Sequence, residues 1–310
     1  MANLGYIQVS RECNQNCRFC SNPPNDVAQT IEAAKDQLDS LVKLGYEGVI
    51  LTGGEPTLCP FLKDIIHYSV AKGLPARIIT NGQLTADRGL LEDYVRAGLS
   101  QMHVSLHSYR PEVQAFLTGN ESSLENAEKT LDNAKSLGLK TDVNTVINRY
   151  NCDHLHETVD HIMNQHPNVT HFVFNNIDPR QNRASKHSDV ISQPWMFELS
   201  LFKAMALIDK RGGTFRVERV PLCFMADFAH CSTEARKIVK AEERTVFFLD
   251  KKGMVRQTEW RYTKSEACDS CNFNQICAGL FEGGEYYDLD QLHAVFLDEA
   301  KVRERIMASN

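Results

Sequence analysis

Short apolar runs rich in β-branched residues alternate with longer amphipathic stretches through the first half of the chain. The short runs, which predict strands, cover residues 6–10, 48–52, 76–80, 101–106, 140–147 and 170–175. The amphipathic stretches, which predict helices, cover residues 27–44, 61–72, 90–97, 124–137 and 152–165. This alternation of strand and helix predicts βα units that build a parallel sheet. It fits a partial or complete barrel and an open doubly wound sheet equally well.

The pattern changes after residue 178. Residues 179–193 are polar and have no period, and a helical stretch, an apolar run and an apparent β-hairpin around Gly253 follow. We therefore predict three parts. They are a parallel α/β unit, a connecting helical segment and a smaller C-terminal α+β domain, over residues 1–178, 179–212 and 213–310 respectively.

Composition and charge narrow the class of protein. With 42% hydrophobic and 24% charged residues over 310 positions, the chain can bury a sizeable core. Its 34 Lys and Arg residues against 40 Asp and Glu give a net charge of -6. The chain has no dense basic block, so we do not expect nucleic acid as a partner. No apolar run reaches the roughly 18 to 20 residues that span a bilayer, and the N-terminus lacks a signal-peptide pattern. We therefore expect a cytoplasmic protein without a membrane partner.

Six of the ten cysteines fall into two close groups, which in a reducing compartment favours metal binding over disulfides. The first group is Cys13, Cys17 and Cys20, in a C-x3-C-x2-C spacing directly after the first predicted strand. A loop this short can place three sulfurs around one face of an iron-sulfur cluster, whereas a zinc site needs a fourth ligand that is not obvious nearby. If the cluster has four irons, one iron stays open to an outside ligand.

This cysteine loop, including the aromatic Phe19, resembles the signature of the radical S-adenosylmethionine (radical SAM) enzymes. The run Thr52-Gly53-Gly54-Glu55-Pro56, one βα unit later, matches the Gly-Gly-Glu-Pro motif of that family. The resemblance covers roughly residues 5–176. It implies a partial (β/α)6 TIM-like barrel, with a [4Fe-4S] cluster on the three cysteines and SAM as a second cofactor.

The resemblance also implies which residues bind SAM. The glycines and the carboxylate of the Gly-Gly-Glu-Pro motif are expected to meet the amino group of its methionine moiety. Polar side chains at the ends of the third and fourth strands and, as a weaker candidate, one within the fifth strand are expected to be further contacts, although each can instead cap strand-end backbone. The expected SAM-binding residues are Gly53, Gly54, Glu55, Pro56, Asn81, Ser105 and Asn144.

The second cysteine group, Cys268, Cys271 and Cys277, has a C-x2-C-x5-C spacing. It resembles the C-terminal auxiliary-cluster region of radical SAM proteins called SPASM, or its shorter form, twitch. The chain has too few cysteines for a full SPASM region, so the resemblance implies one auxiliary [4Fe-4S] cluster. We favour Cys223 as the fourth ligand because it directly follows a predicted strand, and Cys231 is the alternative. Zinc at this group is a further alternative.

The function implied by the resemblance is reductive cleavage of SAM to a 5′-deoxyadenosyl radical, which abstracts a hydrogen atom from a small-molecule or peptide substrate. The outcome can be oxidation, epimerisation or bond formation, and the electron is expected from a donor such as flavodoxin or ferredoxin. One alternative is a maturase that modifies a peptide side chain. An alternative of another class is a non-catalytic iron-sulfur or zinc scaffold or redox sensor, which would not need the motif at residues 53–56.

Overall fold

The computed structural model describes residues 3–180 and 183–309. Its centre is a single nine-stranded sheet in the order β7-β6-β5-β4-β3-β2-β1-β8-β9. All neighbouring strands run parallel except β8 and β9, which form an antiparallel hairpin. The strands are β1 (Leu4–Ser10), β2 (Gly48–Gly53), β3 (Ala76–Thr80), β4 (Leu99–Ser105), β5 (Lys140–Ile147), β6 (His171–Asn176), β7 (Thr214–Glu218), β8 (Arg244–Phe247) and β9 (Met254–Gln257).

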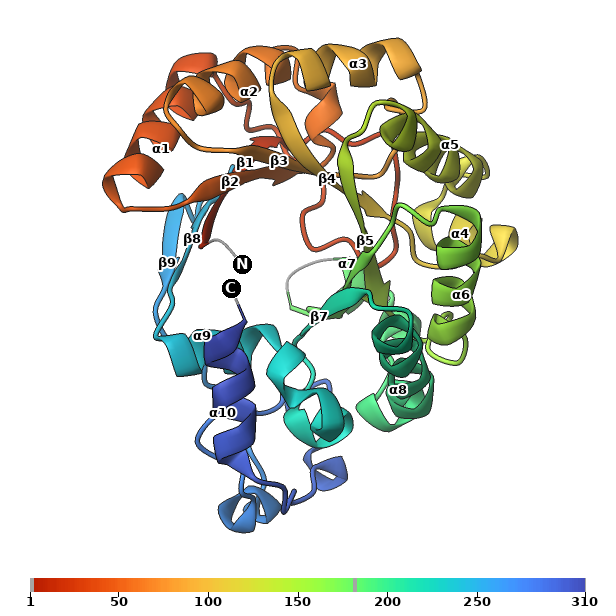
Figure 1. Ribbon diagram of the computed structural model, residues 1–310, viewed down its shortest axis with the longest axis vertical. Coiled ribbons are helices and arrows are strands. Elements are labelled where there is room, and N and C mark those ends of the chain that lie inside the picture. The colour runs from red at the N-terminus through yellow and green to blue at the C-terminus, as the bar shows by residue number, and fades with distance from the viewer. Residues whose placement is uncertain (1–2, 181–182, 310) are drawn as a thin grey trace.

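The sheet curves into an open barrel with the larger helices on its outer side (Figure 1). β7 and β9 are its two edges, so the barrel does not close. The α-helices are α1 (Ile31–Lys43), α2 (Leu62–Ala71), α3 (Arg88–Arg96), α4 (Pro111–Thr118), α5 (Ser123–Ser136), α6 (Leu155–Gln165), α7 (Arg183–Lys186), α8 (Pro194–Lys210), α9 (Thr233–Lys240) and α10 (Glu299–Ala308). In the part of the chain that the structure describes, no helix is both long and apolar enough to cross a bilayer.

The partial TIM-like α/β barrel implied by the sequence is confirmed, and most predicted elements are present within a few residues of their expected ends. Helix α1 begins later than expected because the side chain of Thr30 accepts a hydrogen bond from the backbone N–H of Ala33 and caps the helix there. Helix α4 is absent from the prediction.

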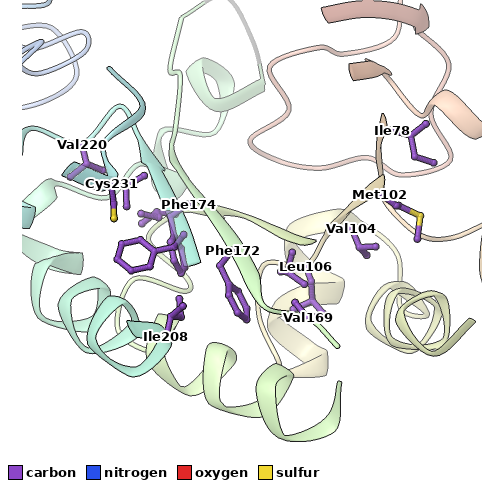
Figure 2. Packing of buried hydrophobic residues seen from close by; sticks show 14 of the residues in the cluster. Ile78, Met102, Val104, Leu106, Val169, Phe172, Phe174, Ile208, Val220 and Cys231 are labelled. Carbon is purple, nitrogen blue, oxygen red and sulfur yellow. The ribbon is translucent and has the colours of Figure 1, made fainter. Parts of the chain in front are cut away.

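The core lies between the sheet and its outer helices. Side chains that alternate along each strand, such as Met102 and Val104 of β4 and Phe172 and Phe174 of β6, are buried there (Figure 2). Burial of one such phenylalanine stabilises the fold by about 1.5–3 kcal/mol. The intervening positions face the inside of the barrel and include polar groups, for example His103, whose Nδ1 lies 3.1 Å from a carboxylate oxygen on β5. The interior of the barrel is therefore partly polar.

The three-part division at residues 178 and 212 stays a prediction, but the sheet crosses both boundaries. β7 pairs with β6, and β8 pairs with the first strand, β1, so strands assigned to the C-terminal domain extend both sides of the barrel sheet. Residues 1, 2, 181, 182 and 310, which fall within the three ranges, lie outside the described residues. The barrel and the C-terminal region are thus joined by shared sheet hydrogen bonds, and not only by the chain.

An ion pair links the two sides of the open barrel. Arg244 on β8 donates two hydrogen bonds, of 2.8 and 3.2 Å, to the carboxylate of Glu218 on β7. The buried carboxyl of Glu234 accepts the backbone N–H of Arg219 at 2.9 Å, and burial together with the nearby charge of Glu218 raises its pKa to about 7. Arg219 itself has φ of 61°, a conformation that non-glycine residues rarely adopt.

The raised pKa of Glu234 predicts a pH-dependent stability. Because folding raises this pKa from 4.5, the neutral carboxyl stabilises the fold at low pH, and that stability is lost as the pH rises through about 7. Glu234→Gln removes the titration and keeps an oxygen that can accept the N–H of Arg219. We therefore expect its free energy of unfolding, relative to wild type, to rise by about 1–3 kcal/mol between pH 5 and pH 8 in urea titrations. Parallel pH profiles for the two proteins would contradict this.

Candidate active site

The first cysteine group lies in the loop that follows β1, at the carboxyl end of the barrel strands, where α/β barrels place their active sites. Backbone hydrogen bonds fix this loop to the end of α4. The N–H of Asn16 donates to the carbonyl of Thr118 at 2.8 Å, and the N–H of Arg18 donates to the carbonyl of Leu117 at 3.0 Å. The loop is therefore held on both sides of Cys17.

The three thiols of the loop are half-buried, and Cys13 and Cys20 lie near enough to Cys17 to influence its ionisation. Burial raises the pKa of the Cys17 thiol far above its usual range, and the neighbouring Cys20 and Cys13 raise it further. Burial also raises the pKa values of Cys13 and Cys20. Without a metal these groups are neutral thiols, and a bound metal would deprotonate them.

Gly53 and Gly54 bring the end of β2 directly against the start of the cysteine loop. The N–H of Gly54 donates to the carbonyl of Ser10 at 2.7 Å, and the N–H of Glu55 donates to the carbonyl of Glu12 at 2.8 Å. Gly53 has φ of 137°, and a Cβ there would lie 2.0 Å from the carbonyl oxygen of Ser10. A Cβ on Gly54 would lie 2.2 Å from the carbonyl oxygen of Glu12. Both glycines are therefore needed to hold the cysteine loop, whether or not they also contact SAM.

The carboxylate of Glu55 is buried and joins the ends of β2 and β3. Its Oε1 accepts hydrogen bonds from the N–H and hydroxyl of Thr57 and from the hydroxyl of Thr80, at 3.1, 2.6 and 2.7 Å. Its Oε2 accepts the N–H of Asn81 at 2.8 Å. These four donors take up most of the acceptor capacity of a carboxylate. Glu55 therefore has a clear structural role, and its contact with the SAM amino group stays a prediction. Pro56 follows it at the start of a short 3-10 helix, Pro56–Leu58.

Asn81 connects the end of β3 to the cysteine loop. Its Nδ2 lies 2.7 Å from Oδ1 of Asn14 and 3.8 Å from Sγ of Cys13. The side-chain amide is therefore placed to donate to a Cys13 thiolate, which would stabilise the negative charge of the sulfur. This gives Asn81 a position at the predicted cluster, in addition to the predicted contact with SAM.

Ser105 and Asn144 lie side by side on adjacent strands. They are register partners in the pairing of β4 with β5, and both side chains are half-buried. The amide of Asn175 on β6 donates to Oδ1 of Asn144 at 2.6 Å. The three residues form a polar row across three consecutive strands, with Ser105 and Asn175 at or near the carboxyl ends of β4 and β6 and Asn144 within β5. Such a row can bind the polar groups of a ligand from one side of the barrel.

The second cysteine group forms a separate site in the C-terminal region. Cys223, Cys268, Cys271 and Cys277 line one cavity with about 320 Å³ of empty volume, together with Phe273 and Leu292 among others. Burial raises the pKa of Cys223 to about 12, and the neighbouring thiols of Cys277 and Cys268 contribute.

Cys231 is not among the described residues that line this cavity. Its thiol lies instead 3.4 Å from Nε2 of His230, and burial raises its pKa to about 11 while Arg216 opposes the shift. Of the two candidates for the fourth position, the structure therefore brings Cys223 to the cysteine group.

The donor set at both places consists of thiols, which are the ligands of iron-sulfur clusters. Three thiols on one loop fit a cluster with an open metal position, and four thiols that line one cavity fit a fully ligated cluster. Within residues 3–180 and 183–309, no three His, Cys, Asp or Glu side chains are placed to share one metal ion. The ligand assignments therefore stay predictions, supported by the residue types and their placement.

Two residues near the cysteine loop are missing from the sequence prediction. His107 is buried with its ring edge against Phe19, 4.7 Å between ring centres, and burial lowers its pKa to about 4, so it is neutral at physiological pH. Arg11 is also buried, donating to Oε1 of Gln8 at 3.0 Å and pairing with Asp250 at 3.4 Å. The sequence around His107 or Arg11 does not indicate a role for either residue, because His107 contacts Phe19 and Arg11 pairs with Asp250, each far away in the sequence.

A chain of hydrogen bonds resembles the relay of a serine hydrolase, but it lacks an accessible nucleophile. The hydroxyl of Ser108 lies 2.8 Å from Nε2 of His154, whose Nδ1 lies 2.5 Å from a carboxylate oxygen of Asp153. Ser108 is fully buried and also accepts the N–H of Arg110 at 3.1 Å. The arrangement therefore orders the segment after β4 and does not favour acyl transfer.

Comparison with known proteins identifies the family. The model of the radical SAM superfamily matches residues 7–162. This range holds the cysteine loop and the Gly-Gly-Glu-Pro turn described above and covers half of the chain. The chain therefore belongs to the radical SAM superfamily.

Relatives within the superfamily differ in substrate. A GTP 3′,8-cyclase of Aquifex aeolicus is 35% identical over 150 residues, which are 46% of this chain and 46% of that protein. A PqqA peptide cyclase of Streptomyces rochei is 28% identical over 162 residues, which are 50% of this chain and 43% of that protein. The chain thus spans about half the length of these relatives.

Solved structures share the fold over nearly the whole chain. Native anSMEcpe with bound AdoMet has a TM-score of 0.65 at 12% identity, covering 98% of this chain and 96% of that one. Streptococcus suis SuiB bound to its precursor peptide SuiA has a TM-score of 0.69 at 15% identity, covering 94% of this chain and 75% of that one. The C-terminal region of this chain is therefore included in the shared fold.

Proposed function

We propose that this protein is a radical SAM enzyme that cleaves SAM reductively and uses the resulting radical to abstract a hydrogen atom from a substrate. The observation that carries the proposal is the direct backbone pairing of the Gly-Gly-Glu-Pro turn with the start of the Cys13–Cys17–Cys20 loop. The pairing places the family's Gly-Gly-Glu-Pro motif directly beside the cysteine loop, which supports a catalytic role over a scaffold or redox sensor. We further propose that it acts in the cytoplasm.

When bound, the [4Fe-4S] cluster and SAM supply the one-electron chemistry that makes the radical. This chain's own residues hold and shield the reacting groups. Cys13, Cys17 and Cys20 would hold the first cluster, with Asn81 positioned beside Cys13. Ser105 and Asn144 would orient the ligand through their polar groups from the adjacent strands β4 and β5. The helices outside the sheet and the C-terminal region would limit the access of water.

We also propose one auxiliary [4Fe-4S] cluster, held by the four cysteines that line the C-terminal cavity. Four protein ligands would saturate the cluster, which suits electron transfer or a structural role better than substrate binding. The proposed substrate is a small molecule or a peptide. The Aquifex GTP cyclase supports the first, and the PqqA peptide cyclase and SuiB with its precursor peptide support the second.

Anaerobic reconstitution tests the proposed activity. The wild-type protein, loaded with iron and sulfide and reduced with dithionite, is expected to release 5′-deoxyadenosine and methionine from SAM, even without substrate. Liquid chromatography with mass spectrometry measures both products. A protein that holds the iron of its clusters but releases neither product would favour the carrier hypothesis.

Iron content tests the assignment of the auxiliary site. Reconstituted wild type is expected to bind about eight irons per chain, four in each cluster. Cys268→Ala with Cys223→Ser is expected to lower this to about four, because two of the four ligands are lost. Cys231→Ser is the matched control and is expected to leave about eight. A loss of iron in the Cys231 variant equal to that of the double variant would show that the fourth ligand is Cys231.

A further inference from the structure

A basic hollow lies between the first cysteine loop, the end of α4 and α7. It has about 740 Å³ of empty volume, part of it open to solvent, and its lining includes Arg18, Arg183, Lys186, His187 and Phe116. No carboxylate is among the described residues that line it. This is unusual for a chain in which 40 acidic residues outnumber 34 basic ones. The hollow is therefore a local positive region on an acidic protein.

The cysteine loop forms part of the wall of this hollow. Asn16 and Arg18, the two neighbours of Cys17, both line it, whereas the Cys17 thiol lies 3.6 Å from Oε1 of the buried Gln15. Arg183 joins the opposite wall to the loop, since its Nη1 lies 3.4 Å from the carbonyl oxygen of Cys17. The loop that is expected to hold the first cluster thus also contributes residues to the hollow.

The charged side chains are available for binding. In the part of the chain that the structure describes, no ion pair neutralises Arg18, Arg183 or Lys186. The guanidinium of Arg18 lies over the ring of Phe116, 4.1 Å from its centre, and that phenylalanine is 39% exposed. The nearby carboxylate of Asp189 accepts a hydrogen bond of 2.7 Å from the hydroxyl of Tyr150. An exposed aromatic ring with an arginine stacked on it is typical of the centre of a protein interface.

We propose that this hollow is the docking surface for a small acidic protein that carries single electrons. The inference rests on the proposed function, because SAM cleavage needs one electron from outside. The carrier is oxidised by one electron, which is consumed when the C5′–S bond of SAM breaks into methionine and a 5′-deoxyadenosyl radical. The protein carries a net charge of -6 whereas this hollow is basic, so charge directs an acidic carrier to the hollow beside the first cysteine loop.

The second large hollow on the outer surface does not fit this partner. It lies along α6 and α8, and Glu157 and Asp160 line it as well as Lys203. Lys203 is therefore a suitable control, since it is an exposed lysine in a hollow with mixed charge and far from the cysteine loop in sequence.

Charge reversal with purified flavodoxin as the probe tests the proposal. The double variant Lys186→Glu with His187→Glu is compared with wild type and with Lys203→Glu, all reconstituted. Isothermal titration calorimetry at low and at physiological salt measures the Kd for flavodoxin. We expect the double variant to raise the Kd at least about tenfold and to weaken its salt dependence, while Lys203→Glu changes it less than about twofold.

The release of 5′-deoxyadenosine provides the second readout. With reduced flavodoxin as the electron source, the double variant is expected to be at least about tenfold slower than wild type at subsaturating flavodoxin. With dithionite, which needs no docking, the two rates are expected to agree within about twofold.

Three results would overturn the docking proposal. They are flavodoxin binding to the double variant as tightly as to wild type, no binding to wild type, and an equal loss of rate with dithionite. Failure of the proposed function gives a different result, because wild type would then release no 5′-deoxyadenosine even with dithionite. In that case the calorimetric Kd values alone would test the docking surface.

Discussion

Cys17→Ala is expected to lower the release of 5′-deoxyadenosine to less than about one-thousandth of the wild-type rate. Cys17 is the central thiol of the loop, and hydrogen bonds to α4 hold the backbone on both sides of it. The substitution therefore removes one sulfur and leaves the loop in place. Two remaining thiols do not suffice to hold the proposed cluster. Product release with SAM and dithionite, measured by mass spectrometry under anoxic conditions, gives the rate.

Cys152→Ala is the matched control for this experiment. Cys152 is a buried free cysteine whose thiol donates to the carbonyl of Arg149 at 3.3 Å, and it belongs to neither cysteine group. We expect this variant to retain the wild-type rate within about threefold, because a small buried thiol is replaced by a small apolar side chain. A Cys17→Ala protein with more than about a tenth of wild-type activity would contradict the assignment of that cysteine.

Gly53→Ala is expected to destabilise the fold by about 3 kcal/mol or more and to remove the iron of the first cluster. Gly53 has φ of 137°, and a Cβ would lie 2.0 Å from the carbonyl oxygen of Ser10. Because this contact is with backbone, no side-chain rotation relieves it. The end of β2 must then move away from the segment that leads into the cysteine loop. Urea unfolding measures the stability, and iron analysis measures the cluster.

Gly138→Ala separates backbone strain from steric overlap. Gly138 also has a positive φ, 65°, but a Cβ there would meet no atom within 4 Å. We expect this variant to lose about 1 kcal/mol of stability and to bind the full amount of iron. If Gly53→Ala were no more destabilising than Gly138→Ala and kept all its iron, the close packing of turn and loop would not be essential.

The barrel strands are predictable because each is a short apolar run between two amphipathic stretches. For β3 and β5 the predicted and observed bounds agree completely. Helix α4 is missed because it is short and follows β4 closely, so its pattern merges with the next helix. Its ends nevertheless carry standard signals, Pro111 in the first turn and Gly119 with φ of 65° after the last. Attention to these two residues could have found the helix.

The candidate site is predictable where residues adjacent in sequence act together. The spacing within each of the two cysteine groups is enough to indicate metal binding. The choice of Cys223 over Cys231 rests on its place after a strand, and the cavity supports it. In contrast, the partners of Gly53 and Gly54 lie some forty residues earlier in the chain, and sequence alone does not reveal them. The same holds for the basic hollow, where α7 meets the cysteine loop only through folding.

For Glu55, the structure shows a role that the family motif does not predict. The resemblance assigns its carboxylate to the amino group of SAM, whereas the structure surrounds it with four donors from Thr57, Thr80 and Asn81. Burial raises its pKa, and these donors oppose the shift. A residue required by the motif can therefore be essential because it holds two strand ends together. Any contact with SAM would add to this role.

Electron paramagnetic resonance of the reduced first cluster tests the central claim most directly. The protein for this measurement carries Cys268→Ala, Cys271→Ala and Cys277→Ala, so that the first site contributes the signal. If Cys13, Cys17 and Cys20 leave one iron open to SAM, saturating SAM must change the spectrum, and SAM labelled with nitrogen-15 at its amino group must show coupling to the cluster. An unchanged spectrum, with SAM binding confirmed independently, would contradict the account.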